Sequence, residues 1–212
     1  MFNRHKTEIV NPDQALPGRP ERPFRLADRH LVLDAPLVTD TVPDGLEVAI
    51  FGLGCFWGAE EIYWQLPGVW STSVGYAGGS TPNPSYDEVC SGRTGHTEAV
   101  RIVYDPAVVP FATLVKTFFE VHDPTQGMRQ GNDIGTQYRS AIYFTTPEQE
   151  KTAHELTDVY AAELTRRRLG DVTTEIKPAP AYFYAEDYHQ QYLAKNPHGY
   201  RCHANTGVKF PA

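Results

Sequence analysis

The chain has 212 residues, which suits one ordinary domain with a sizeable core, or one domain with an extension. Its net charge of −7 argues against nucleic acid as a general partner, because nucleic-acid binding usually needs a basic face. No apolar run approaches the length that spans a membrane, and the N-terminus lacks the apolar region of a signal peptide. We therefore expect a cytoplasmic protein. We also expect a monomer, although none of these features bears on the oligomeric state.

The three cysteines are Cys55, Cys90 and Cys202, an odd number at wide spacing and without a Cys-x-x-Cys pair. So few cysteines in a chain of this length argue against a disulfide scaffold. If two of them pair, the bond is better interpreted as transient and redox-active. The alternative is three inert thiols.

Residues 1–45 are rich in Pro, Asp and Arg and contain no periodic segment. Their prolines would interrupt any helix. We interpret this stretch as an extended arm that wraps the domain or is partly disordered. Residues 46–212 then form the domain itself, with a flexible tail over 198–212.

The next feature is Cys55, in a Gly-rich turn between a predicted strand and a predicted helix. Residues 46–51 are an apolar run typical of a buried strand, and residues 59–66 favour a helix. Unpaired backbone N–H groups and the helix dipole favour negative charge at a helix start. We therefore expect a thiol that loses its proton readily, with Phe56 and Trp57 forming an apolar surface beside it.

Three interpretations compete for this turn: a buried structural cysteine, a dinucleotide-binding turn and a catalytic thiolate. Strand, Gly-x-Gly and helix is how the dinucleotide fingerprint begins. Here, however, the third glycine is one place late, and Phe56 and Trp57 crowd the place of a pyrophosphate. The next predicted strand, 69–76, has no acidic residue to hold a ribose. The catalytic interpretation needs partners elsewhere in the chain.

Residues 77–86 form a long loop dense in turn residues, followed by a short helical turn over 86–90 and a strand over 96–104. In that strand Glu98 shares a face with the apolar residues at 100, 102 and 104, whereas Arg101 marks the wetter face. Burial would raise the pKa of Glu98 so that it stays protonated near neutral pH. The alternative is a glutamate at a frayed strand end in water.

The C-terminal half alternates helices and strands. We predict a helix from Pro110 to about 122, a polar loop over 125–137, a strand over 138–144 and a helix from Pro147 to about 169 with Thr146 as its N-cap. A strand over 172–177 and a helix over 185–195 follow. This order predicts an α/β (α+β) fold: a ferredoxin-like split βαβ sandwich, with a mixed sheet and helices mainly on one face. A doubly wound parallel sheet is the alternative.

A thiolate, two aromatic rings and a neutral carboxylic acid suit the reduction of a substrate that carries a departing oxygen. That oxygen needs a proton from a group whose pKa lies near the working pH. Tyr76, Tyr86 and Tyr138 stand at loop or strand junctions and could hydrogen-bond it; for each, the alternative is a packing role. Attack on a sulfoxide would leave a sulfenic acid on Cys55, which a second thiol converts to a disulfide. The rings suit a methyl-thioether group.

Five motifs, in this order, closely resemble the signature of the A-type peptide methionine sulfoxide reductases over roughly residues 45 to 202. They are Gly54-Cys55-Phe56-Trp57-Gly58, Val74-Gly75-Tyr76-Ala77-Gly78-Gly79, Gly95-His96-Thr97-Glu98-Ala99-Val100, Gln130-Gly131-Asn132-Asp133-Ile134-Gly135-Thr136-Gln137-Tyr138-Arg139-Ser140 and Glu186-Asp187-Tyr188-His189-Gln190-Gln191-Tyr192. The resemblance implies that Cys55 is the nucleophile and that Glu98 protonates the sulfoxide oxygen. Tyr86 and Tyr138 would hold that oxygen by hydrogen bonds.

The resemblance also implies a substrate. The family reduces the S-epimer of methionine sulfoxide, free or in proteins, and the resemblance implies no cofactor. Phe56 and Trp57 would hold the substrate's ε-methyl group, and Asp133 would line the site. The glycines between residues 52 and 58 would let the sulfoxide approach the thiol.

Recycling of the oxidised enzyme is where this chain departs from the pattern. Some relatives carry two C-terminal cysteines, whereas here no cysteine follows Cys202. Cys202, on a Gly-flanked tail, is the expected resolving thiol, and Cys90, in a more structured turn, is the alternative. The final reductant would be thioredoxin or another small dithiol protein.

Two other interpretations use the same residues. His189, His198, Cys202 and His203 could be imagined as zinc ligands, but they show no known ligand spacing, and we expect no metal. A non-catalytic thiol redox sensor or methionine-binding module would use the aromatic pocket without turnover.

Overall fold

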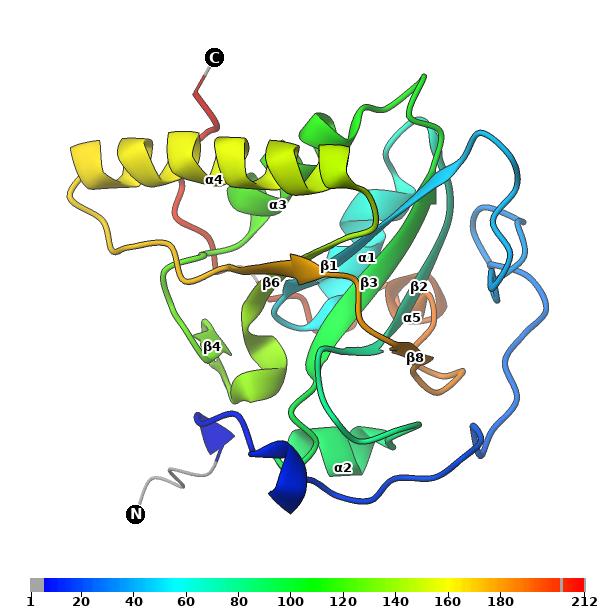
Figure 1. The fold of residues 1–212 in the computed structure, drawn as a ribbon. Coiled ribbons are helices and arrows are strands. Elements are labelled where there is room, and N and C mark those ends of the chain that lie inside the picture. The colour runs from blue at the N-terminus through cyan, green and yellow to red at the C-terminus, as the bar shows by residue number, and fades with distance from the viewer. Residues whose placement is uncertain (1–5, 203, 212) are drawn as a thin grey trace.

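The protein is described by a computed structural model that covers residues 6–202 and 204–211. Six of its strands form one mixed sheet in the order β7-β6-β1-β3-β2-β8, and β4 and β5 form a separate two-stranded ribbon (Figure 1). The strands are β1 (Glu47–Leu53), β2 (Val69–Ala77), β3 (Thr97–Tyr104), β4 (Arg129–Gln130), β5 (Asp133–Ile134), β6 (Ser140–Phe144), β7 (Glu175–Pro178) and β8 (Tyr182–Tyr184).

The centre of the sheet is a split βαβ unit. Helix α1 (Phe56–Trp64) connects β1 to β2, and β3 lies between these two strands and is antiparallel to both. With β6 on the other side of β1, the four central strands have the ferredoxin-like order that the sequence predicts. The doubly wound parallel alternative is wrong, because β6 and β7 are the only parallel pair in the described part of the chain.

Three helices, α1, α3 (Phe111–Val121) and α4 (Pro147–Arg166), pack on one face of the sheet, as predicted. Apolar residues of α3 recur at helical spacing and are buried against the alternate residues of β1 and β3 that face them. The long helix α4 begins as predicted: Thr146 is the N-cap, its hydroxyl accepts from the Gln149 N–H, and Pro147 is the first helical residue.

Part of the other face of the sheet is covered by the N-terminal arm. Arg101 projects from this face, and its guanidinium donates to the hydroxyl of Thr39 and, at 2.9 Å, to its carbonyl. The arm includes the 3-10 turn η2 (Pro12–Gln14), and in Figure 1 it passes beneath α2 (Tyr86–Cys90) and up the side of the molecule. The described part of the arm, residues 6–45, therefore lies along the domain.

The C-terminal third departs most from the sequence prediction. A helix over 185–195 is wrong: turns occupy this stretch and only α5 (Tyr192–Lys195) forms. Gln191 is left-handed, with φ of 46°, and its backbone N–H donates to the buried carboxylate of Glu60 at 2.7 Å. Tertiary partners therefore replace the helical hydrogen bonds. The short strand β8 and the 3-10 turn η3 (Thr136–Tyr138) were not predicted.

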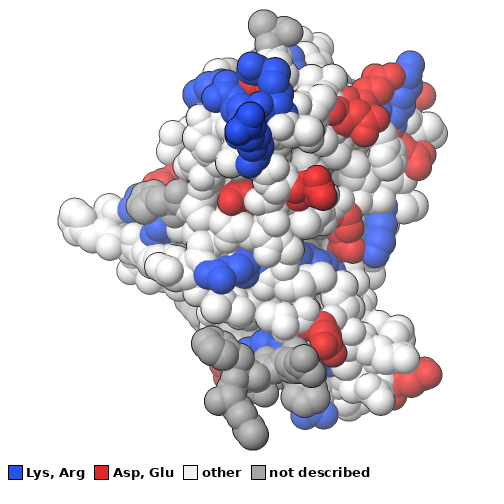
Figure 2. Space-filling model, turned by 90° about the vertical axis from the view of Figure 1, so that its left-hand side faces the viewer, with Lys and Arg blue, Asp and Glu red and all other residues white. Residues whose placement is uncertain are grey.

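Charged side chains of both signs share the face shown in Figure 2, where basic side chains gather at the top. No helix in the described part of the chain is long and apolar enough to span a bilayer.

Candidate functional site

Cys55 occupies the turn between β1 and α1, as the residue just before the helix. Gly54 makes the turn with φ of +93°, and a Cβ there would lie 2.7 Å from the Gln130 side chain. A Cβ on Gly52 would lie 2.9 Å from Thr97 Oγ1. The expectation that these glycines let a substrate approach is therefore wrong for both, because they make room for protein neighbours. Gly58 alone among them adjoins open space.

A cavity of about 90 Å³ opens beside this turn. It is lined by Cys55, Phe56, Trp57, Tyr86, Glu98, Asp133, Tyr138 and Tyr200. The structure thus brings together seven residues that the sequence singled out from five separate segments. Tyr200 is the lining residue that was missed, and Cys90 and Cys202 lie outside the lining.

Glu98 is the buried acid of the cavity, with 2% of its surface exposed. The backbone N–H of Phe56 donates to its Oε2 at 3.1 Å, so the carboxyl is held against the first turn of α1 beside Cys55. Burial raises the pKa of Glu98 to about 8, the charge of Asp133 adds to this, and the Phe56 hydrogen bond opposes it. The carboxyl is therefore mainly protonated at neutral pH, and the frayed-end alternative is wrong.

The pKa of Cys55 differs from the expectation. Burial raises it well above the ordinary thiol value, and the charges of Glu98, Asp133 and Cys202 act in the same direction. A hydrogen bond from the backbone of Trp57 lowers the pKa, as a helix start should, but it does not outweigh burial. The Cys55 thiol is therefore mainly protonated at neutral pH, and the titratable group beside it is the protonated acid Glu98.

Two of the three candidate tyrosines reach the cavity. Tyr86 is the first residue of α2, and Tyr138 is the last residue of η3. Burial, with the charge of Glu98, raises the pKa of both, so both hydroxyls are neutral donors. Tyr76 instead lies behind Phe56, at 6.0 Å between rings, and its hydroxyl donates to Glu186 at 2.9 Å.

The aromatic wall is fixed by residues to which the sequence gave no role. Trp57 stacks on Tyr192 with 3.8 Å between ring centroids, and its indole N–H donates to His189 Nδ1 at 3.0 Å. The His189 ring also contacts Phe56 and Tyr86 at 5.1 and 4.6 Å. Burial lowers the pKa of His189 to about 4, so the ring is a neutral acceptor at pH 7. The motif over 186–192 was the signal available for these contacts.

The C-terminal tail crosses the opposite side of the cavity. The Tyr200 hydroxyl donates to Asp133 Oδ2 at 3.1 Å, and the Arg201 guanidinium makes two 2.7 Å contacts to the Glu61 carboxylate of α1. The Cys202 thiol lies 3.6 Å from the Gln130 carbonyl oxygen. The tail is therefore docked beside the thiol of Cys55 by side chains that precede and include Cys202.

Beyond Cys202, the tail is anchored on the helical face. Val208 is 3% exposed within the main core, and its carbonyl accepts from the Tyr160 hydroxyl at 3.0 Å. Phe210 stacks on Tyr160 with 5.6 Å between ring centroids. Such contacts on an unpatterned segment could not be predicted from periodicity. Cys202 is thus flanked by anchored residues on both sides.

Cys90 is the last residue of α2 and is half-buried. All three cysteines are free thiols. Among the described residues, no group of three or more His, Cys, Asp or Glu side chains is arranged to hold a metal ion, and His203 lies outside the described residues.

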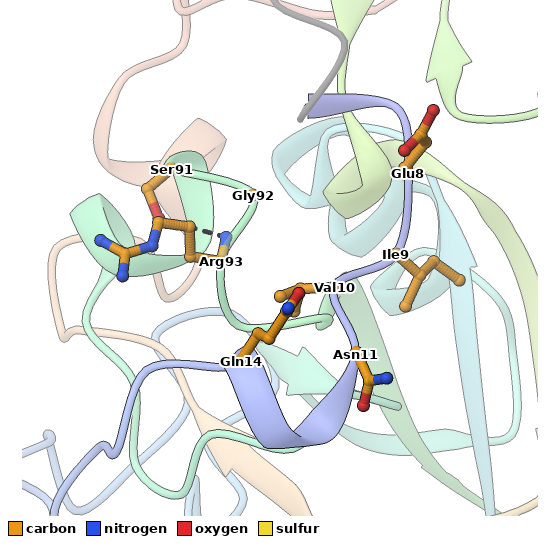
Figure 3. A pocket seen from close by; sticks show the side chains of 8 residues that line it. All are labelled: Glu8, Ile9, Val10, Asn11, Gln14, Ser91, Gly92 and Arg93. Carbon is orange, nitrogen blue, oxygen red and sulfur yellow. Dashed lines mark hydrogen bonds between the residues drawn. The ribbon is translucent and has the colours of Figure 1, made fainter.

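A larger cavity, of about 630 Å³, lies between the arm and the loop after α2 (Figure 3). Its lining is Glu8, Ile9, Val10, Asn11, Gln14, Ser91, Gly92 and Arg93. It contains no thiol and no buried acid, so the smaller cavity is the candidate site.

The fold and the smaller cavity define a class of enzyme that reduces a small oxygen-bearing group with a protein thiol. The thiol and a protonated acid meet where neutral donors and aromatic rings converge. A site of this kind can give a proton to an oxygen and accept that oxygen on sulfur.

Comparison with known proteins identifies the family. The family model for peptide methionine sulfoxide reductase matches residues 47–211. A relative from Salinispora arenicola, named peptide methionine sulfoxide reductase MsrA, is 59% identical over 100% of this chain and 96% of its own. The chain belongs to the peptide methionine sulfoxide reductase family, as its motifs predict.

Solved structures agree with this assignment. Methionine sulfoxide reductase A of Corynebacterium diphtheriae is 49% identical, with 97% of this chain and 100% of that chain covered and a TM-score of 0.86. Mxr1 from Saccharomyces cerevisiae in reduced form is 34% identical over 76% of this chain and 91% of that chain, with a TM-score of 0.70. Mxr1 in complex with Trx2, at 20% identity and a TM-score of 0.51, supports the fold alone.

Proposed function

We propose that this chain reduces the S-epimer of methionine sulfoxide, free and in proteins, with Cys55 as nucleophile and Glu98 as acid. One observation carries the assignment of roles: the Phe56 N–H holds the protonated Glu98 carboxyl at the helix start where Cys55 lies, and both line one cavity. The acid is thus placed to protonate an oxygen bound to the sulfur that the thiol attacks.

The reductive step begins with proton donation. Glu98 gives its proton to the sulfoxide oxygen, and Cys55 sulfur attacks the substrate sulfur as its own proton leaves. The attack forms a bond between the two sulfurs. The oxygen then moves from the substrate sulfur to the Cys55 sulfur while the substrate sulfur–oxygen bond and the sulfur–sulfur bond both break, which leaves a sulfenic acid on Cys55 and releases methionine. The proton that Glu98 gave stays on the oxygen of the sulfenic acid. The proton that leaves the Cys55 thiol passes to Glu98, so Glu98 ends the step protonated. Cys55 is oxidised and the substrate is reduced by the same two electrons.

The other lining residues bind and orient the substrate. The neutral hydroxyls of Tyr86 and Tyr138 donate to the sulfoxide oxygen, which carries partial negative charge. Phe56 and Trp57 pack on the ε-methyl group, since sulfur and its methyl pack well on rings. Asp133 lines the opposite wall, where Tyr200 orients it.

Cys202 is the resolving thiol of the proposal. Its thiol condenses with the Cys55 sulfenic acid, which forms the disulfide and releases water. Its position supports this role: the Cys202 thiol lies 3.6 Å from the Gln130 carbonyl oxygen, and the Gln130 side chain packs on Gly54, the residue before Cys55. Cys90 is instead the last residue of α2. Thioredoxin or another dithiol protein then reduces the disulfide by thiol–disulfide exchange.

The test separates the two epimers and counts thiols. Purified protein is incubated with S- or R-methionine sulfoxide and dithiothreitol, and methionine is quantified; turnover of the S-epimer alone is expected. Without reductant, one equivalent of the S-epimer should remove two free thiols. A redox sensor or methionine-binding module would make no methionine, and that result would overturn the proposal.

The proposal also includes a cytoplasmic monomer. Light scattering on the purified protein should give the 23.7 kDa mass of a single chain.

A further inference from the structure

The N-terminal arm docks tightly on the loop that leads into α2. The Arg19 N–H donates to the Pro82 carbonyl at 3.0 Å, and the Leu16 carbonyl accepts from the Thr81 hydroxyl at 2.8 Å. Between them, Gly18 has φ of +64°, and a Cβ there would lie 2.2 Å from the Pro82 carbonyl oxygen. The two backbones are therefore in direct contact, at a place where only glycine fits.

Arg19 ties the arm to both the loop and the helix. Its guanidinium donates to the Asn83 carbonyl at 2.6 Å and to Glu88 Oε1 at 2.9 Å, and its own carbonyl accepts from the Asn83 side chain at 2.9 Å. The Arg19 and Glu88 side chains are 31% and 26% exposed, so both are largely held against the protein. Arg19 thus joins the arm both to the loop before α2, at Asn83, and to α2 itself, at Glu88.

Glu88 is also half of the capping box that starts α2. Its Oε2 accepts from the Ser85 N–H at 2.8 Å, and the Ser85 hydroxyl accepts from the Glu88 N–H at 3.3 Å. The helix has only five residues, which is too short to be stable without tertiary support. The contact with Arg19 fixes the carboxylate that makes the cap.

The first residue of this helix is Tyr86, whose side chain lines the cavity of Cys55. The Tyr86 backbone N–H donates to the Glu186 carboxylate at 2.9 Å. Both the arm and the 186–192 segment therefore form hydrogen bonds to α2. A small displacement of α2 would move the Tyr86 hydroxyl from the place where it meets the sulfoxide oxygen, and such misplacement is costly for rate.

We propose that Arg19 is a positioning residue for Tyr86, through which the N-terminal arm sets the geometry of the reductive step. The inference rests on the role of Tyr86 in the proposed function. The family model begins at residue 47, whereas the Salinispora relative aligns over the whole chain, arm included. The arm therefore adds to a chemistry that the shared part of the family already contains. We therefore expect that loss of the arm's contacts slows the reductive step by some factor and does not abolish it.

The experiment measures methionine formed in a single turnover at saturating S-methionine sulfoxide, without reductant. Arg19→Ala should slow this step about fivefold, as expected for a displaced positioning group. Glu88→Gln, which keeps an acceptor for the cap but loses the ion pair, should slow it by a similar factor. Arg25→Ala is the matched control: this arm arginine is exposed and no contact is described for it, so the rate should stay unchanged.

A double-mutant cycle distinguishes positioning from general loosening. In a Tyr86→Phe background, where the hydroxyl is absent, Arg19→Ala should cause no further loss of rate. An equal fivefold loss in that background, or an unchanged rate for Arg19→Ala alone, would overturn the proposal. Thermal unfolding of each variant verifies that it is folded at the assay temperature, and Arg19→Lys supplies a milder variant if Arg19→Ala is not. Wild-type protein without turnover would refute the proposed function instead, so the two failures are distinguishable.

Discussion

The two sides of the cavity are built in different ways. On one side, Cys55 and Glu98 come from the end of β1 and from β3 in the middle of the sheet, and the backbone N–H of Phe56, the residue after Cys55, donates to the Glu98 carboxyl. On the other side, Tyr200 and Cys202 belong to a tail without regular structure, and 46% of the Tyr200 surface is exposed. The groups that need fixed geometry thus lie on rigid elements, and the thiol that must later be reached by another protein lies on the tail.

The two sides of the cavity also differ in how firmly they are held: the contacts around Glu98 are stronger than those that hold the tail. Glu98 is enclosed by the core, and moving it would disturb the sheet. The tail beside the cavity is held by the Tyr200–Asp133 hydrogen bond and by the Arg201–Glu61 ion pair, whose side chains are 30% and 22% exposed. Both are polar contacts between partly exposed side chains, and water can replace them when they break. The tail beside the cavity is therefore held less firmly than Glu98, and its release would let a reductant reach the disulfide.

The largest expected effect is at the rigid side. Cys55→Ser should abolish methionine formation, including the first stoichiometric turnover. A serine hydroxyl cannot take up the substrate's oxygen, whereas a thiol does so by becoming a sulfenic acid. The measurement is methionine released per enzyme in the absence of reductant, with Cys90→Ser as control. Stoichiometric methionine from Cys55→Ser would place the nucleophile elsewhere.

Cys202→Ser should separate the reductive step, which uses Cys55 and Glu98, from the recycling step, which uses the tail. This variant should still form one methionine per enzyme, because the reductive step needs only the rigid side, but it should lose turnover with thioredoxin. Free-thiol counts after one equivalent of sulfoxide should show no disulfide. If Cys202→Ser still cycles with thioredoxin, Cys90 becomes the resolving candidate, and Cys90→Ser in that background tests it.

Glu98→Gln should slow the reductive step by about 10²–10³-fold, a typical contribution of a general acid. The acid form is the active one, so in the wild type the step should be fastest below the pKa of about 8 and should fall as pH rises through that value. Single-turnover rates between pH 6 and 10 should show this fall in the wild type and not in the variant. A fall that persists in the variant would assign it to another group.

The smallest expected effect is at the ion pair of the tail. Arg201→Ala and Glu61→Ala should each slow disulfide formation a few-fold and leave the release of methionine unchanged, and the double variant should lose no more than either single one. Raising the ionic strength should slow the wild type toward the variants. Lys209→Ala, which removes an ion pair to Glu120 farther along the tail, is a suitable control. Additive losses would mean that the two residues act separately.

The sequence predicts the rigid side well because that side is built from local patterns. The apolar runs at 46–51 and 96–104 place Cys55 at the end of one strand and Glu98 near the start of another, and alternation along β3 points Glu98 to the face that the helices cover. The ferredoxin-like order of the strands follows from the order of the elements. These features need no knowledge of distant contacts.

The tail and the pKa of Cys55 could not be predicted in the same way. Tyr200 reaches Asp133, and Val208 enters the core, through contacts between residues far apart in sequence that no periodicity announces. The helix start does favour the thiolate, but the net pKa depends on burial, which outweighs it. The predicted helix over 185–195 begins only at Tyr192, because Gln191 before it is left-handed and donates its N–H to a buried carboxylate, Glu60. In each case a long-range contact overrides a local preference.

The size of the cavity has a consequence for which damage can be repaired. A space of about 90 Å³ admits the tip of one side chain and leaves the backbone of a target protein outside. Recognition is then confined to the sulfoxide and its methyl group, and the residues around it contribute little. Such a site accepts methionine sulfoxide in almost any sequence context, provided that the oxidised side chain can extend away from its own fold. Methionines oxidised in buried positions would have to wait until local unfolding exposes them.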